Sequence, residues 1–144
     1  MNSIIKKWFT IIPLLVALAL VSCSKDDPVK DITKPTAVIS NPVEGSIFQR
    51  GASIILDATF MDDHMLASCD VSIVSLKALK GFDDPWMPNV DVIILEGEED
   101  EVTAHQVFKQ AIPMDIMSGE YSLTFKVVDE AGNYTDYPVN ITIE

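Results

Sequence analysis

The side chains best able to do chemistry in this sequence are acids and histidines, and they fall into three groups. Met61-Asp62-Asp63-His64 is one group, the acidic run 96–101 precedes His105, and Asp129 stands near Asn133. Clustered carboxylate oxygens suit Ca²⁺, whereas an aspartate with two histidines would suit Zn²⁺. The candidate metal ligands are therefore Asp62, Asp63, His64, His105 and Asp129.

These acids have a second interpretation, because charged turn residues are mostly solvated and bind nothing. A shared metal requires the three groups to meet at one end of the fold, and no spacing matches an EF-hand loop. Ca²⁺ or Zn²⁺ is the only cofactor that the residue types suggest.

Segment 81–88 is a second candidate site, because Phe82 and Trp86 lie there among acids and prolines. The prolines keep this segment out of a central strand. Exposed aromatic rings could stack on a glycan or anchor a protein partner. The interpretation that we favour is that Trp86 folds back and covers the open end of the fold.

Motifs of catalysis and nucleic-acid binding are missing from the sequence. It contains no Gly-rich phosphate loop, no Gly-x-Ser-x-Gly and no His-Glu-x-x-His. The 144 residues carry 10 Lys+Arg against 22 Asp+Glu, a formal net charge of −12. Nucleic-acid binding needs a basic face, so this charge argues against it. We expect neither an enzyme nor a nucleic-acid partner.

The N-terminus has the layout of a secretory signal. Lys6 and Lys7 precede an apolar run over residues 8–21, which is shorter than the roughly 20 residues that span a bilayer. The run ends in Leu20-Val21-Ser22-Cys23, which resembles a bacterial lipobox. That resemblance implies that residues 1–22 are removed and that Cys23 is acylated. The alternative is an ordinary signal with a cysteine by chance.

The polar segment 23–35 is predicted to be a lipidated tether. Its start, Ser24-Lys25-Asp26-Asp27, resembles the signal that exports lipoproteins of polysaccharide-utilising Gram-negative bacteria to the outer face of the outer membrane. This implies a palmitate-type lipid anchor in the outer membrane and display at the cell surface. The alternative location is the periplasmic face of that membrane.

From Thr36 onward the chain shows the period of two that is typical of strands. In the best example Tyr121, Leu123, Phe125 and Val127 share one face. Strands are expected over 36–40, 53–60, 68–77, 90–95, 102–112 and 121–128, with a last one around 139–143. This pattern predicts an all-β, antiparallel β-sandwich of about seven strands over residues 36–144. Three of its loops gather at one end, which would bring the three acidic groups together.

The last third of the chain carries a family resemblance. The segment from Ser118 through the Tyr121 strand to Gly132-Asn133 resembles the penultimate hairpin of bacterial Ig-like domains. The whole plan resembles small bacterial surface lipoproteins with a single Ig-like domain of unknown function. Tyr121 stands where a tyrosine corner would begin a strand, and Leu123 takes the place of a disulfide cysteine.

The resemblance implies a non-catalytic lipoprotein that presents loops for adhesion or for a protein partner. The alternative function is capture of a small ligand, either a divalent cation at the acidic loops or a glycan at Trp86. Cys69, without a disulfide partner once Cys23 is acylated, is expected to be a small buried residue.

Overall fold

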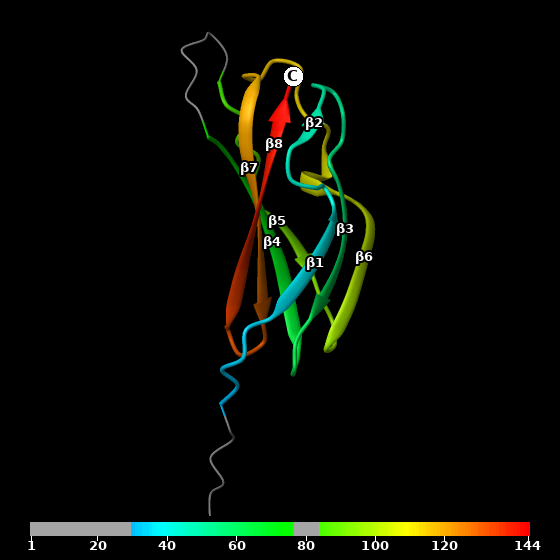
Figure 1. Cartoon of the computed structure of the whole chain (residues 1–144), viewed down its shortest axis with the longest axis vertical. Helices are drawn as coiled ribbons and strands as arrows, with labels where there is room; N and C mark the ends of the chain where they lie inside the picture. Colours follow the sequence, from blue (N-terminus) through cyan, green and yellow to red (C-terminus); the bar gives the residue numbers. More distant parts are fainter. Residues whose placement is uncertain (1–29, 77–83) are drawn as a thin grey trace, which may run out of the picture.

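Two β-sheets packed face to face form the part of the chain that the computed structural model describes, residues 30–76 and 84–144 (Figure 1). The predicted signal, Cys23, residues 24–29 of the predicted tether and Phe82 lie outside these residues. The elements are β1 Thr36–Asn41, β2 Ser46–Phe48, β3 Ile55–Met61, β4 Leu66–Ser75, β5 Asp91–Ile94, β6 Glu99–Gln106, the 3-10 helix η1 Val107–Lys109, β7 Gly119–Asp129 and β8 Tyr134–Ile143. The described residues contain no helix long and apolar enough to cross a membrane.

The strand order is that of an Ig-like sandwich. One sheet has three strands in the order β1-β3-β6, and the other has five in the order β2-β8-β7-β4-β5. Neighbouring strands are antiparallel except for β2, which runs parallel to β8. The all-β sandwich predicted from the sequence is confirmed.

Alternating side chains of the two sheets fill the space between them. The inward residues of β7, which are Tyr121, Leu123, Phe125 and Val127, are fully buried, as the period of two predicts. Facing strand β3 contributes Leu56 and Phe60, also fully buried. Cys69 in β4 belongs to this core, and burial raises the pKa of its thiol to about 12. The core is therefore held by apolar packing without a disulfide.

Tyr121 forms the corner that its position suggested. Its hydroxyl donates to the Met117 carbonyl at 2.6 Å and accepts from the Trp86 backbone N–H at 3.3 Å. Trp86 is 4% exposed and meets Phe108 edge-on, with ring centroids 5.1 Å apart. Trp86 thus covers the core, which is the arrangement that we favoured over an exposed aromatic site.

Most strands lie within two residues of their expected bounds, but β8 begins at Tyr134, ahead of the expected 139, and the strand expected over 102–112 is shifted at both ends. The strand expected over 102–112 ends at Gln106, because Phe108 (φ 61°) and Lys109 (φ 54°) turn the chain through the left-handed region. It also begins earlier, since Glu99, Asp100 and Glu101 pair with the end of β3. Acidic residues are poor strand formers alone, and their pairing with β3 overrides that preference.

Strand β2 was not expected. It follows the turn at Gly45 (φ 78°) and adds three residues along β8, from Ser46 opposite Ile141 to Phe48 opposite Ile143. A three-residue strand is too short to show a period in the sequence.

Candidate metal centre

The connections β3–β4, β5–β6 and β7–β8 meet at one end of the sandwich. Backbone hydrogen bonds join them: Asp62 N–H donates to the Glu98 carbonyl at 2.8 Å, and Glu130 N–H donates to the Met65 carbonyl at 2.9 Å. Residues 30–35 approach β1 at this same end (Figure 1). The side chains that the sequence placed in separate loops are therefore brought to the end where the tether arrives.

Three carboxylates converge at this end: Asp31 from the tether, Asp62 from the β3–β4 connection and Asp129 from the end of β7. One oxygen of each lies within 4.8 Å of the other two. Asp129 is 2% exposed and the Asp31 side chain is 9% exposed. We call these three residues the carboxylate cluster.

Two buried oxygens of the carboxylate cluster accept no hydrogen bond from any described residue. They are Asp31 Oδ2 and Asp62 Oδ1. The second oxygen of each carboxylate is engaged locally: Asp31 Oδ1 accepts from Thr33 N–H at 2.9 Å, and Asp62 Oδ2 accepts from His64 N–H at 3.2 Å. Local backbone bonds thus fix both carboxylates and leave one oxygen of each without a donor.

Asn133 forms hydrogen bonds with two members of the carboxylate cluster, Asp129 and Asp31. Both Asp129 oxygens accept from it, one from the backbone N–H at 2.8 Å and one from the side-chain amide at 2.7 Å. The same amide donates to the Asp31 backbone carbonyl at 3.3 Å. Asn133 therefore links the β7–β8 turn to the tether.

His64 and Asp63 lie at the solvent edge of the cluster. His64 Nδ1 is 3.2 Å from Asp63 Oδ1 and 3.6 Å from Asp31 Oδ2. The hydrogen bond to Asp63, followed by the negative charge of Asp31, raises the pKa of His64 above its ordinary value. In return the bond from His64, followed by that from Thr33, lowers the pKa of Asp63. His64 is 60% exposed, and it is the only base that the described residues pair with this cluster.

His105, the remaining predicted ligand, lies elsewhere. Its Nε2 is 2.8 Å from Asp91 Oδ2. Among the described residues, His105 belongs neither to the carboxylate cluster nor to a second group of potential ligands, Asp31, Asp63 and His64. The expected strand already held His105, but β6 begins at Glu99 instead of 102, so His105 lies near the far end of the strand, opposite Leu56. The side chains of the acidic run 96–101 also stay out of both groups. The expected site therefore contains Asp62, Asp63, His64 and Asp129 without His105.

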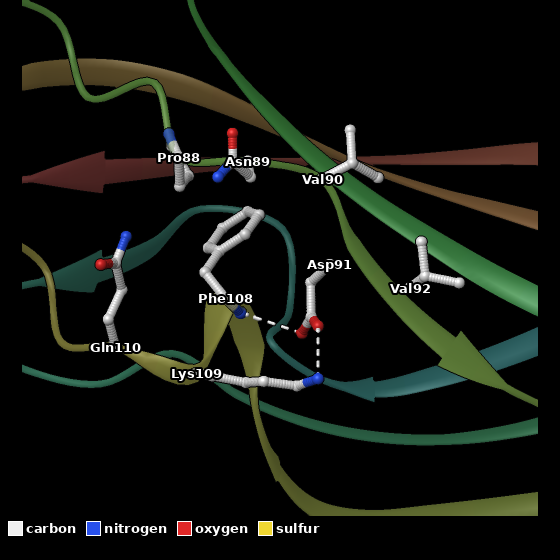
Figure 2. Close-up of a pocket in the computed structure, with 8 residues that line it drawn as sticks. All are labelled: Pro88, Asn89, Val90, Asp91, Val92, Phe108, Lys109 and Gln110. Atoms are coloured by element: carbon white, nitrogen blue, oxygen red, sulfur yellow. Dashed lines mark hydrogen bonds and ion pairs between the residues drawn. The ribbon is translucent and has the colours of Figure 1, made fainter.

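Asp91 is the centre of a separate open pocket of about 410 Å³ (Figure 2). Besides His105, its Oδ2 accepts from Phe108 N–H at 3.0 Å, and its Oδ1 lies 3.9 Å from Lys109 Nζ. Asp91 is 5% exposed, and its bonds tie β5 in one sheet to the end of β6 in the other. The eight lining residues, all described, include no Ser, Thr or Cys.

Sequence reasoning missed two residues, Asp31 and Asp91. Asp31 lies in a polar segment without a period, so nothing assigned it a position; its one local signal is the spacing to Thr33, whose N–H it caps. Asp91 begins a strand of otherwise apolar residues, and an acid at such an inward position is the signal that could have identified it.

A family model described as "Domain of unknown function (DUF4625)" matches residues 21–144. Because the match spans most of the sequence, the chain belongs to this family. No curated protein matches it. Among solved structures, the fibronectin(III)-like modules of Clostridium thermocellum CbhA are similar at 16% identity, with a TM-score of 0.42 over 75% of this chain and 94% of that one.

Proposed function

We propose that this DUF4625 member is a non-catalytic Ig-like module, anchored in the outer membrane through Cys23, that binds one Ca²⁺ at the end of the sandwich adjoining its tether. The carboxylate cluster of Asp31, Asp62 and Asp129 supplies the ligands. The observation that carries the proposal is the pair of buried oxygens without a donor, Asp31 Oδ2 and Asp62 Oδ1.

A buried carboxylate oxygen without a partner is costly, and three neighbouring carboxylates also repel one another. A divalent cation removes both penalties at once. Thr33 N–H, His64 N–H and Asn133 already donate to Asp31, Asp62 and Asp129 respectively, and these bonds hold the three carboxylates in place for a cation.

The geometry favours Ca²⁺ over Zn²⁺. Ca²⁺ binds oxygen at about 2.3–2.6 Å, so two of its ligands are at most roughly 4.6–5.2 Å apart, and the three oxygens of the cluster lie within 4.8 Å of one another. Zn²⁺ prefers nitrogen and sulfur ligands, and the nearest histidine, His64, turns its Nδ1 toward Asp63 and Asp31. A chain with a formal charge of −12 also attracts cations generally.

Anchoring and surface display rest on the residues around Cys23. The lipobox-like Leu20-Val21-Ser22-Cys23 supports acylation, and Ser24-Lys25-Asp26-Asp27 supports export to the cell surface. In that arrangement the acidic end faces the membrane, and the opposite end, with the C-terminus and β2, is offered to a protein partner (Figure 1). A glycan site at Trp86 loses its basis, because that ring is buried.

Thermal melts test the cation site. The protein is used with Cys23→Ser, which prevents acylation, in Ca²⁺, in Zn²⁺ and in chelator. We expect Ca²⁺ to raise Tm by several degrees relative to chelator, because a ligand that binds only the folded state stabilises it. Zn²⁺ should raise Tm less.

Asp62→Asn should abolish the shift. Its matched control is Glu130→Gln, which removes the same charge from an exposed residue in a neighbouring turn and should leave the shift intact. Equal melts in Ca²⁺ and chelator would refute the cation site.

A further inference from the structure

We infer that Ca²⁺ clamps the tether to the sandwich, because one ligand, Asp31, belongs to the tether and the other two, Asp62 and Asp129, belong to the fold. This inference rests on the proposed function and gives the cation a structural role. The bound cation fixes the direction in which the sandwich leaves its anchor.

Asp31 is the most buried of the described residues 30–34 that precede Pro35. It lies five residues before β1, outside both sheets, and its side chain is 9% exposed. Its neighbours Ile32, Thr33 and Lys34 are exposed, Ile32 at 79%. Among the described residues 30–34, none is a buried apolar residue that would hold the segment against the sandwich, and the buried contact is a negative charge.

The polar contacts that the described residues 30–34 make with the sandwich are few, and Lys34 Nζ lies 5.8 Å from the centroid of the Tyr134 ring. Asn133 donates to the Asp31 carbonyl at 3.3 Å, and Thr33 Oγ1 donates to Asp63 Oδ2 at 2.9 Å. His64, which is 60% exposed, adds an ion pair with Asp31 at 3.6 Å. The Thr33 bond is exposed and the His64 imidazole is mostly exposed, and exposed ion pairs contribute little individually.

Repulsion within the carboxylate cluster acts directly on the tether. The Asp31 carboxylate faces Asp62 and Asp129 within 4.8 Å, so like charges push it away from the fold. A divalent cation bound between the three carboxylates replaces this repulsion by attraction of each carboxylate to the cation. The tether is the member of the cluster able to leave without disturbing a sheet, so it is the part whose order depends on Ca²⁺.

The clamp moves the first attachment point on the sandwich closer to Cys23 along the sequence. From Cys23 to Asp31 there are eight residue steps, which reach at most about 26–29 Å, whereas the 13 steps to Thr36 reach at most about 43–47 Å. Binding at Asp31 therefore gives the sandwich an attachment point five residues nearer to Cys23 than its first strand.

Hydrogen exchange measured by mass spectrometry tests the clamp in the Cys23→Ser protein. The amides of residues 31–36 should exchange at least about tenfold more slowly in Ca²⁺ than in chelator, because a local opening must now release the cation. The amides of β7 serve as the internal reference for folding and should exchange equally in both.

Asp31→Asn should remove this protection and weaken Ca²⁺ binding in calorimetry by about tenfold or more, since ligand charge sets affinity. Its control, Asp27→Asn, makes the same change four residues earlier in the tether and should keep both properties.

The outcomes separate the inference from the proposed function. If Ca²⁺ binds equally to the parent and to Asp31→Asn, and exchange over 31–36 does not change, the clamp is overturned while the cation site stands. If the parent binds no Ca²⁺, both are overturned. Slower exchange that disappears in Asp31→Asn, with β7 unchanged, supports the clamp.

Discussion

At the residue scale, the carboxylate cluster combines burial, like charge and missing donors in three side chains. Asp129 is satisfied by Asn133, whereas Asp31 and Asp62 each keep one oxygen without a donor. Substitution of one acid in such a cluster should therefore change the stability of the protein in opposite directions with and without the cation.

Asp62→Asn should stabilise the protein in chelator and destabilise it in Ca²⁺, relative to the parent. Without the cation, the substitution removes one of three charges whose oxygens lie within 4.8 Å of one another, a gain of about 1 kcal/mol in the free energy of unfolding. With Ca²⁺, it removes a ligand. Urea unfolding under both conditions measures the two signs, and destabilisation of equal size in both would contradict the site.

Cys69 should be inert in the native protein. Burial, followed by the negative charge of Asp70, raises its pKa to about 12, so at pH 8 only about one thiol in ten thousand is ionised. In the Cys23→Ser protein Cys69 is the single cysteine. A disulfide reagent should label it within minutes in urea and negligibly without urea. Fast labelling of the native protein would contradict its burial.

The candidate site was predicted from the sequence where its residues lie in turns between recognisable strands. Asp62, Asp63, His64 and Asp129 fall in that class, because strand periods place the turns and the sandwich brings the turns together. Asp31 could not be placed, since an aperiodic tether has no register with the sheets. His105 was misplaced because a strand of acids gives no apolar period.

At the element scale, β7 and the Tyr121 corner at its start connect several other parts of the fold. Strand β7 pairs with both β4 and β8, and Tyr121 at its start bonds the Met117 carbonyl and the Trp86 N–H. One hydroxyl therefore ties the loop before β7 to the segment before β5.

Tyr121→Phe should cost about 1–3 kcal/mol of unfolding free energy, because it leaves a buried carbonyl and a buried N–H without their partner. Tyr134→Phe is the matched control, since Tyr134 is 46% exposed and its ring, which lies below Lys126 Nζ, is kept. It should change stability by less than about 0.5 kcal/mol. Chemical denaturation measures both, and equal values would argue against the corner.

The long strands could be predicted because each has a buried face that forces alternation; β3, β4 and β7 are examples. Strands whose formation depends on pairing with a neighbouring strand could not be predicted. The part of β6 that pairs with the end of β3 consists of acids, which by themselves favour loops. The helix η1 forms because Phe108 N–H donates to buried Asp91. Both depend on contacts between residues far apart in the sequence, which a local pattern does not contain.

At the scale of the whole molecule, the acidic end and the predicted anchor belong together. The tether, the carboxylate cluster and three interstrand connections share one end, and the C-terminus lies at the other (Figure 1). A lipid on Cys23 would therefore place the cation site near the membrane and the opposite end away from it.

Cys23→Ser should move the protein from the membrane fraction to the soluble fraction of cells, because several acyl chains hold a protein far more firmly than one. Cys69→Ser, which removes the other cysteine, should leave the protein in the membrane fraction. Fractionation followed by immunoblotting measures both. A Cys23→Ser protein that stays with the membrane would contradict the lipid anchor.

Calorimetric titration of the Cys23→Ser protein with Ca²⁺ tests the central claim most directly. We predict one saturable site per chain, with a Kd of about 10⁻³ M or tighter, as in extracellular calcium modules. A folded protein, with the Tyr121 corner intact, that gives no saturable heat up to roughly 10 mM Ca²⁺, well above that range, would contradict the account.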